Sequence, residues 1–79
     1  MNIEKTIQLM LDTNPRIYKE IAVEIAMMKQ TNTEDSWLHY SGCAIGISRD
    51  DYGDGLVYRA TAYPSHENLE AYVHIGDYK

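Results

Sequence analysis

Three features of this chain are candidates for metal binding or catalysis. They are an acidic turn, three histidines and one cysteine. The turn, Asp50-Asp51-Tyr52-Gly53-Asp54-Gly55, matches a calcium-binding loop at positions one, five and six. Its third position is Tyr52, however, and its twelfth is Thr61, where such a loop needs a bidentate glutamate. We therefore expect no calcium here. An Asp-Gly pair is typical of a hairpin turn, because it supplies positive φ angles.

The histidines and the cysteine do not form a recognisable catalytic or metal-binding motif. His39, His66 and His74 are far apart in the sequence and lack a paired metal-ligand spacing. Cys43 falls on the apolar side of a strand pattern, where a free cysteine behaves as a small hydrophobe. Ser65-His66-Glu67 are consecutive, so they cannot form a triad by themselves. We predict no catalysis, metal or cofactor, although a small enzyme or ligand-binding domain using His39, Cys43 or His74 in a helix–sheet cleft stays open as an alternative.

The first half of the chain predicts two amphipathic helices, over residues 3–12 and 15–30. Pro15 fits the first turn of the second helix but cannot continue the first, so the chain is expected to bend sharply there. The apolar stripe of the second helix consists of Ile17, Ile21, Ile25 and Met28. Val23 and Met27 lie off this stripe, and we expect them to make a smaller contact with the first helix.

The second half changes to the twofold alternation of strands with one buried face. The predicted strands cover residues 43–48, 56–63 and 69–75. Because their connections are short, they should form an antiparallel meander, which the helical stripe covers on one face. The predicted fold is a two-layer α+β domain, α-α-β-β-β, with a helical part (2–30), a linker (31–36) and a sheet part (37–78) in a single domain over residues 1–79. The stretch 36–40 is ambiguous, because Thr33 is able to cap a short helical turn there.

Tyrosine is the main aromatic residue, with seven copies and no phenylalanine. The alternation places Tyr58 on the buried face, and Tyr63 and Tyr72 on the outer face beside several polar side chains. A glycine inside a strand, such as Gly46, often marks the close approach of another group. Tyrosine offers a large ring with a hydrogen-bonding hydroxyl, so this face is predicted to bind a protein. The alternative is a solvated sheet face that uses tyrosine for cross-strand packing, with Arg59 opposite Glu70 or His74.

The net charge of −5 lies entirely in residues 31–79, whereas residues 1–30 balance to zero. Carboxylates repel phosphate backbones, so we expect no direct contact with nucleic acid and instead a protein partner with a basic surface. No run of about 18 apolar residues is present to span a membrane, and we expect a cytoplasmic protein. The predicted partner-binding residues are Asp50, Asp51, Tyr52, Asp54, Arg59, Tyr63, Glu67, Glu70, Tyr72 and His74.

In composition alone, the chain resembles small phage-encoded proteins that inhibit host defence or DNA-processing factors. The shared features are short length, acidity, richness in tyrosine and the lack of catalytic motifs. The resemblance implies an inhibitor that works in the host cytoplasm by occupying a basic, nucleic-acid-handling surface of its partner. A further alternative is self-association, because residues 43–48 and 69–75 are expected to form the two edges of the sheet.

Overall fold

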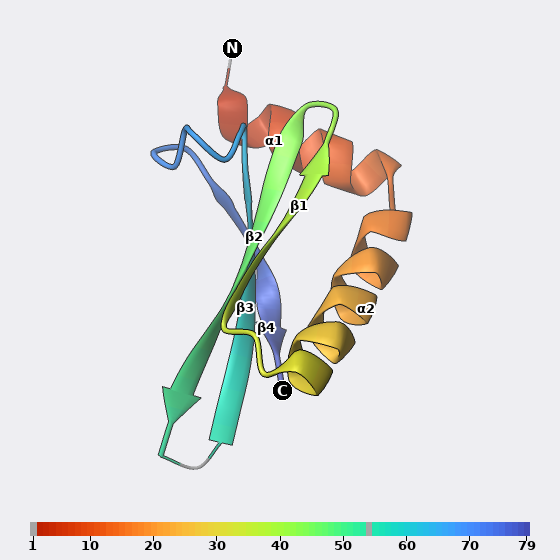
Figure 1. Cartoon of the computed structure of the whole chain (residues 1–79). Coiled ribbons are helices and arrows are strands. Elements are labelled where there is room, and N and C mark those ends of the chain that lie inside the picture. Colours follow the sequence, from red (N-terminus) through yellow and green to blue (C-terminus); the bar gives the residue numbers. More distant parts are fainter. Residues whose placement is uncertain (1, 54) are drawn as a thin grey trace.

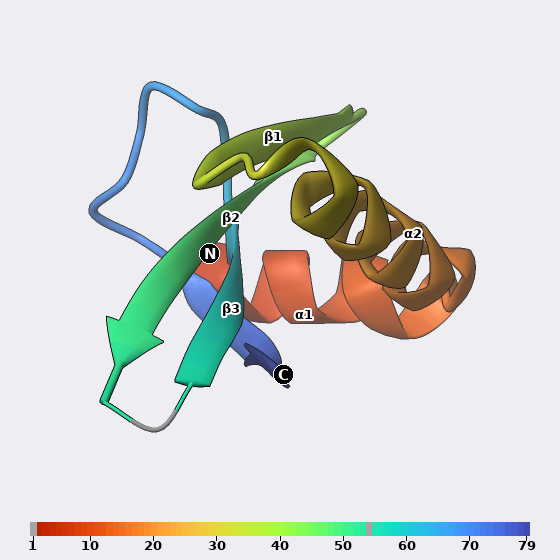
Figure 2. The ribbon, with the colours of Figure 1, turned by 60° about the horizontal axis from the view of Figure 1, so that its bottom comes forward.

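The computed structural model describes residues 2–53 and 55–79, with only the backbone of Tyr52. Two helices, α1 (Ile3–Thr13) and α2 (Arg16–Thr31), are followed by four strands: β1 (Asp35–Tyr40), β2 (Cys43–Tyr52), β3 (Gly55–Tyr63) and β4 (Val73–Tyr78) (Figure 1). The strands form one antiparallel sheet in the order β1-β2-β3-β4. Both helices lie on one side of this sheet, the inner face, and the loop of residues 64–72 lies on the other side, the outer face (Figure 2). The α+β class and the meander are therefore confirmed.

Local capping interactions set the ends of both helices. The side-chain oxygen of Asn2 accepts hydrogen bonds from the backbone amides of Glu4 (3.0 Å) and Lys5 (3.2 Å), which satisfies two amides at the start of α1. Pro15 turns the chain into α2 with a φ of −62°. Asn32 ends α2 in the left-handed conformation, with a φ of 56°, and asparagine tolerates this conformation better than most residues. The predicted helix boundaries differ from the observed ones by only one residue.

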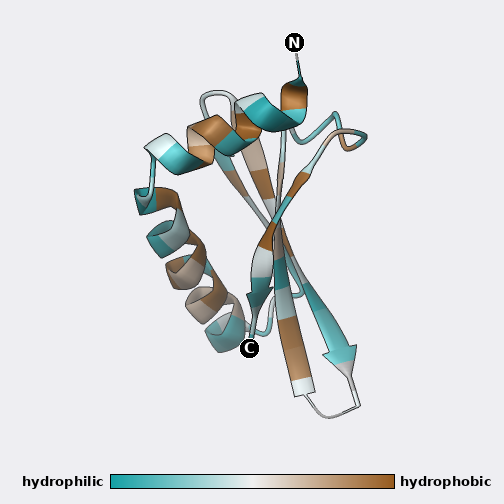
Figure 3. Ribbon diagram, turned by 180° about the vertical axis from the view of Figure 1, so that it is seen from behind, coloured by the Kyte–Doolittle hydropathy of each residue, from teal (hydrophilic) through white to brown (hydrophobic). Residues whose placement is uncertain are grey.

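The core lies between the helices and the inner face. It is built from Ile7 and Leu11 of α1, Ile17, Ile21, Ile25 and Met28 of α2, Cys43, Ile45 and Ile47 of β2, and Tyr58, Ala60 and Ala62 of β3. Hydrophobic and hydrophilic segments alternate along both helices, as expected for elements that bury one side (Figure 3). Tyr58 is buried, as predicted, and the ammonium group of Lys29 lies 5.6 Å from its ring centroid. Val23 and Met27 are each 53% exposed and lie outside the core.

The prediction of three strands was wrong by one, because β1 occupies residues placed in the linker and in the ambiguous stretch. Its inner positions are Ser36, Leu38 and Tyr40, and two of these three are polar. The hydroxyl of Ser36 donates to the carboxylate of Glu24 (2.7 Å), and that of Tyr40 donates to the carboxylate of Glu20. Helix α2 therefore satisfies polar groups that point to the inner face, and hydrophobic alternation alone could not reveal this strand.

The extra strand changes which strands lie at the edges. β2 is internal, so the prediction that residues 43–48 form an edge was wrong; the edges are β1 and β4. β4 begins at Val73 instead of at residue 69, because residues 64–72 form a loop, which contains an isolated bridge between Ser65 and Asn68. β2 and β3 also run past both neighbours as a two-stranded ribbon (Figure 1).

Tyr40 predicts a stability change at alkaline pH. Burial, together with the hydrogen bond to the Glu20 carboxylate, raises the pKa of Tyr40 above the ordinary value of about 10. The unfolded chain then loses this proton first, so the stabilisation is complete below about pH 10 and is lost as the pH rises further. Burial raises the pKa of Tyr78 as well, so the effect has two sources.

We expect Tyr40→Phe to make the free energy of unfolding fall less steeply than in the wild type between about pH 9 and pH 11. At pH 7 the same variant should lose about 1 kcal/mol, because the hydrogen bond to Glu20 is removed. Urea denaturation at a series of pH values measures both effects. Parallel curves for the two proteins would show that Tyr40 does not ionise differently in the folded state.

Candidate protein-interaction surface

Five rings meet on the outer face and form the ring cluster: Trp37, His39, Tyr63, His66 and Tyr72. Trp37 lies 5.7 Å from Tyr63, and Tyr63 lies 6.4 Å from Tyr72, measured between ring centroids. His66 lies across the end of the sheet, 5.3 Å from His39 and 6.5 Å from Trp37. The rings come from β1, β3 and the loop of residues 64–72, and together they make one continuous aromatic surface.

Small residues in β2 allow these rings to approach each other. Strand register places Gly46 between Trp37 and Thr61, and Ala44 between His39 and Tyr63. A Cβ atom on Gly46 would lie 3.3 Å from both the Trp37 ring and the Tyr63 ring, which is closer than ordinary contact. The predicted close approach at Gly46 is therefore made by the protein's own side chains. Ala44 is only 2% exposed for the same reason, although it lies on the outer face.

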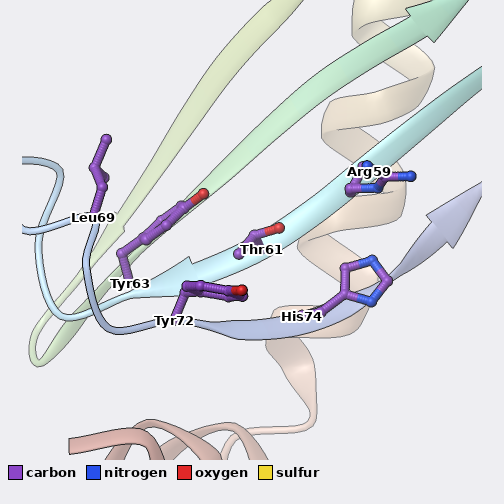
Figure 4. A pocket seen from close by; sticks show the side chains of 6 residues that line it. All are labelled: Arg59, Thr61, Tyr63, Leu69, Tyr72 and His74. Carbon is purple, nitrogen blue, oxygen red and sulfur yellow. The ribbon is translucent and has the colours of Figure 1, made fainter.

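An open depression of about 370 Å³ lies beside the ring cluster (Figure 4). It is lined by Arg59, Thr61, Tyr63, Leu69, Tyr72 and His74. Four of these six residues belong to the predicted partner-binding set. In the predicted strand of residues 69–75, Leu69 alternates with Tyr72 and was therefore expected on the buried face. It is instead 51% exposed and lines the depression, because the chain is still in the loop at this residue. A smaller hollow of about 120 Å³, lined in part by Trp37 and Gly46, continues the surface towards β1.

Arg59 lies at the charged end of this surface, between two carboxylates. Its Nε is 3.2 Å from Asp77 Oδ1, and its terminal nitrogen is 3.6 Å from Asp50 Oδ2. His74 Nε2 lies 3.1 Å from the same Asp77 oxygen. Hydrogen bonds from Arg59, and then from His74, hold the pKa of the Asp77 carboxyl below its usual value. The predicted pairing of Arg59 with Glu70 or His74 was wrong, because the residue opposite Arg59 is Asp77.

A β-bulge explains why Asp77 was missed. Regular alternation from His74 would place Gly76 on the outer face and Asp77 on the inner face. The register shifts at Ala60/Thr61, so that Thr61 pairs with His74 whereas Ala60 pairs with Gly76. Ile75, between His74 and Gly76, is the extra residue of the bulge. It exchanges the faces to which the following residues of β4 point. Asp77 therefore lies on the outer face beside Arg59.

The acidic residues of the sheet half, where the structure describes them, do not form one patch. Asp50 and Asp77 lie with Arg59, and Asp35 lines the smaller hollow in the same half of the sheet. Glu67 and Glu70 are exposed in the loop of residues 64–72, at the other end of the ring cluster. Asp51 is exposed, but it is the next residue of β2 after Asp50 and therefore points to the opposite face of the strand. The Tyr52 side chain and Asp54 lie outside the described residues.

The residues of the catalytic alternative do not converge. Cys43 is 3% exposed within the core, and burial raises the pKa of its thiol, which opposes thiolate formation. His39 and His74 lie on the outer face, on the other side of the sheet. Within residues 2–53 and 55–79, no three His, Cys, Asp or Glu side chains gather as metal ligands.

The chain matches no protein-family model, no curated protein and no solved structure. Neither helix, in the part of the chain that the structure describes, is long and apolar enough to cross a bilayer.

We expect Gly46→Val to separate Trp37 from Tyr63, because the added side chain needs the space that the two rings fill. Overpacking of this kind should cost about 1–2 kcal/mol of stability. Trp37 is the only tryptophan, so its fluorescence should shift to longer wavelength as the ring becomes hydrated. Ser48→Val is the matched control, two residues along the same face of β2, and it should keep the wild-type spectrum. An unchanged spectrum in Gly46→Val would contradict the packing described here.

We expect Arg59→Gln to raise the pKa of Asp77, because the guanidinium supplies the largest part of the stabilisation of that carboxylate. In the wild type this stabilisation is present above the unfolded pKa of about 3.9 and is lost as the pH falls through the lower folded value. A carboxyl-detected NMR titration measures the shift, and Arg16→Gln on α2 serves as the control. If the Asp77 curve is identical in Arg59→Gln, the pairing is not formed in solution.

Proposed function

We propose that the protein is an acidic interaction module, and that the ring cluster and the adjoining depression dock onto a basic surface of a partner protein. The observation that carries this proposal is an aromatic surface left uncovered by the helices. Trp37 is 40% exposed, Leu69 51% and Tyr72 57%. Large rings with polar tips are typical anchors of protein interfaces, and each buried anchor contributes about 2 kcal/mol or more.

Charge favours a protein partner over nucleic acid. Aromatic platforms that stack on bases are normally combined with a basic groove for the phosphates. Here the guanidinium of Arg59 is held by Asp50 and Asp77, and Glu67 and Glu70 lie at the other end of the surface. The helices carry as many basic as acidic residues, so the excess negative charge belongs to the sheet half. Such a surface attracts basic partners and repels phosphates.

The mode of action that we propose is competition. Proteins that handle nucleic acid hold its phosphates with clustered Lys and Arg side chains. Carboxylates at both ends of the ring cluster would pair with those side chains, and the rings would cover the apolar surface between them. The partner would then be unable to bind its nucleic acid. This is the inhibition expected from the compositional resemblance to phage-encoded inhibitors of host defence or DNA-processing factors.

The test begins with capture of partners from nuclease-treated bacterial lysate by the tagged wild type and by two variants. Tyr72→Ala removes an exposed ring of the cluster, and Leu9→Ala removes an exposed apolar side chain of α1, which is 63% exposed. We expect a basic nucleic-acid-binding protein to be captured by the wild type and by Leu9→Ala. For the purified pair, Tyr72→Ala should weaken the affinity by roughly 30-fold, the equivalent of about 2 kcal/mol.

Two further measurements on the purified pair separate the proposal from non-specific binding. Raising the salt concentration should weaken the affinity strongly, and a duplex oligonucleotide should displace the protein from its partner. Equal capture by Tyr72→Ala and the wild type would overturn the docking surface. Affinity that is independent of salt, or that is unaffected by the oligonucleotide, would overturn the mode of action.

A further inference from the structure

β1 presents an open row of backbone groups at the edge of the sheet. Its turn contains only residues 41–42, so Tyr40 and Cys43 form the closing pair, which is hydrogen-bonded in a two-residue hairpin. Bonded positions alternate along an antiparallel strand, and the Glu34 carbonyl accepts from the Arg49 amide (2.8 Å), in step with this alternation. The backbone N–H and C=O groups of Trp37 and His39 therefore point away from β2 and towards solvent.

The two edges of the sheet differ in how they are protected. Natural edge strands are usually blocked by lysine, proline, a bulge or a covering element. β4 has a bulge. Lys79 directly follows β4, and its carbonyl accepts a hydrogen bond from the ammonium group of Lys29 (2.8 Å). β1, Asp-Ser-Trp-Leu-His-Tyr, has neither lysine nor proline, and its register with β2 is regular. The β1 edge is the one that is ready to accept another strand.

A groove runs beside this edge, between β1 and α2. It has a volume of about 480 Å³ and is lined by Arg16, Lys19, Glu20, Val23, Glu24 and Leu38. Val23, which belongs to this lining, and Met27, one turn further along α2, are each 53% exposed. Apolar side chains therefore lie at the middle of the groove, with the basic residues towards the start of α2 and the acidic residues interleaved further along it.

The groove is complementary to itself. Ser36 bonds to Glu24 and Tyr40 bonds to Glu20, so α2 runs antiparallel to β1 and Leu38 lies level with residues 22–23. A twofold axis beside Leu38 would place Trp37 opposite His39 of a second copy, in bonding register. The same axis would bring the two Val23 side chains together. It would also place the basic start of each α2 beside the acidic residues and the negative end of the other helix.

We propose that the partner at this edge is a second copy of the chain, and that the two β1 strands pair antiparallel across the twofold axis. The two sheets become one continuous sheet, and the two α2 helices pack side by side over it. Burial of Val23, Met27 and Leu38 supplements a core that is small in a 79-residue chain. This inference does not depend on the proposed function, because it uses the backbone edge of β1 and the groove beside α2, and not the side-chain rings of the ring cluster.

Sedimentation velocity tests the association over a range from about 10 µM to about 1 mM. The wild type should form a dimer as the concentration rises. Val23→Lys places a charge at the twofold axis and should raise the dimer Kd by at least about tenfold, or about 1.4 kcal/mol. Leu9→Lys on α1 is the matched control, because Leu9 is exposed and lies outside the groove, and it should dimerise like the wild type. Both substitutions replace exposed side chains, so both variants should fold.

Amide hydrogen exchange locates the interface. The amides of Trp37 and His39 should become protected as the concentration rises, whereas the amides of β4 should not change. Three results would overturn the proposal: a monomer throughout the concentration range, protection of β4 instead of β1, or a dimer that Val23→Lys does not weaken. A monomer whose β1 amides become protected only when a different protein is added would assign the edge to that protein, and would equally overturn self-pairing.

Discussion

Two helices can cover only one face of a four-stranded sheet, and this limit governs how the chain uses its apolar residues. The isoleucine-rich stripe of α2 packs on the inner face, where Ile45 and Ile47 of β2 meet Tyr58, Ala60 and Ala62 of β3. Among the residues that the structure describes, no helix covers the outer face. Its order comes from side chains that tolerate water on one side, namely tyrosine, tryptophan and histidine. The rings of the outer face thus suit a surface that is open to water, whether or not a partner binds.

The same limit explains why the two faces of β2 carry side chains of different size. On the inner face this strand carries Cys43, Ile45 and Ile47, which fill the core. On the outer face it carries Ala44 and Gly46, which leave room for rings from both neighbouring strands. Large side chains on the inner face of β2 fill the core, and small side chains on its outer face leave room for the rings. A single central strand therefore supports both the buried core and the ring cluster. Gly46 lacks a positive φ angle, so its role is to provide space and not unusual backbone geometry.

Local patterns were sufficient to predict the helices, the meander and the faces of Tyr58, Tyr63 and Tyr72, because each depends on a period that is visible in the sequence. Two missed features depended on distant residues, and a third depended on where a loop ends. β1 was missed because the partners of Ser36 and Tyr40 are carboxylates on α2. Asp77 was missed because its face depends on a bulge opposite Ala60 and Thr61. Leu69 was assigned to the core because the apolar alternation already begins in the loop of residues 64–72, before β4 starts at Val73. The candidate surface was predicted only in part, because Trp37 belongs to the missed strand.

The burial of Cys43 gives the protein an internal chemical probe of its own motion. Its thiol lies beside the β1–β2 turn, and burial disfavours the thiolate, which is the species that reacts with alkylating reagents. A reagent in solution can reach this sulfur only when the packing around it opens. The rate at which the single cysteine is modified therefore measures how often that end of the domain opens. A ligand that holds β1 in place should slow the modification, even if it never touches the sulfur.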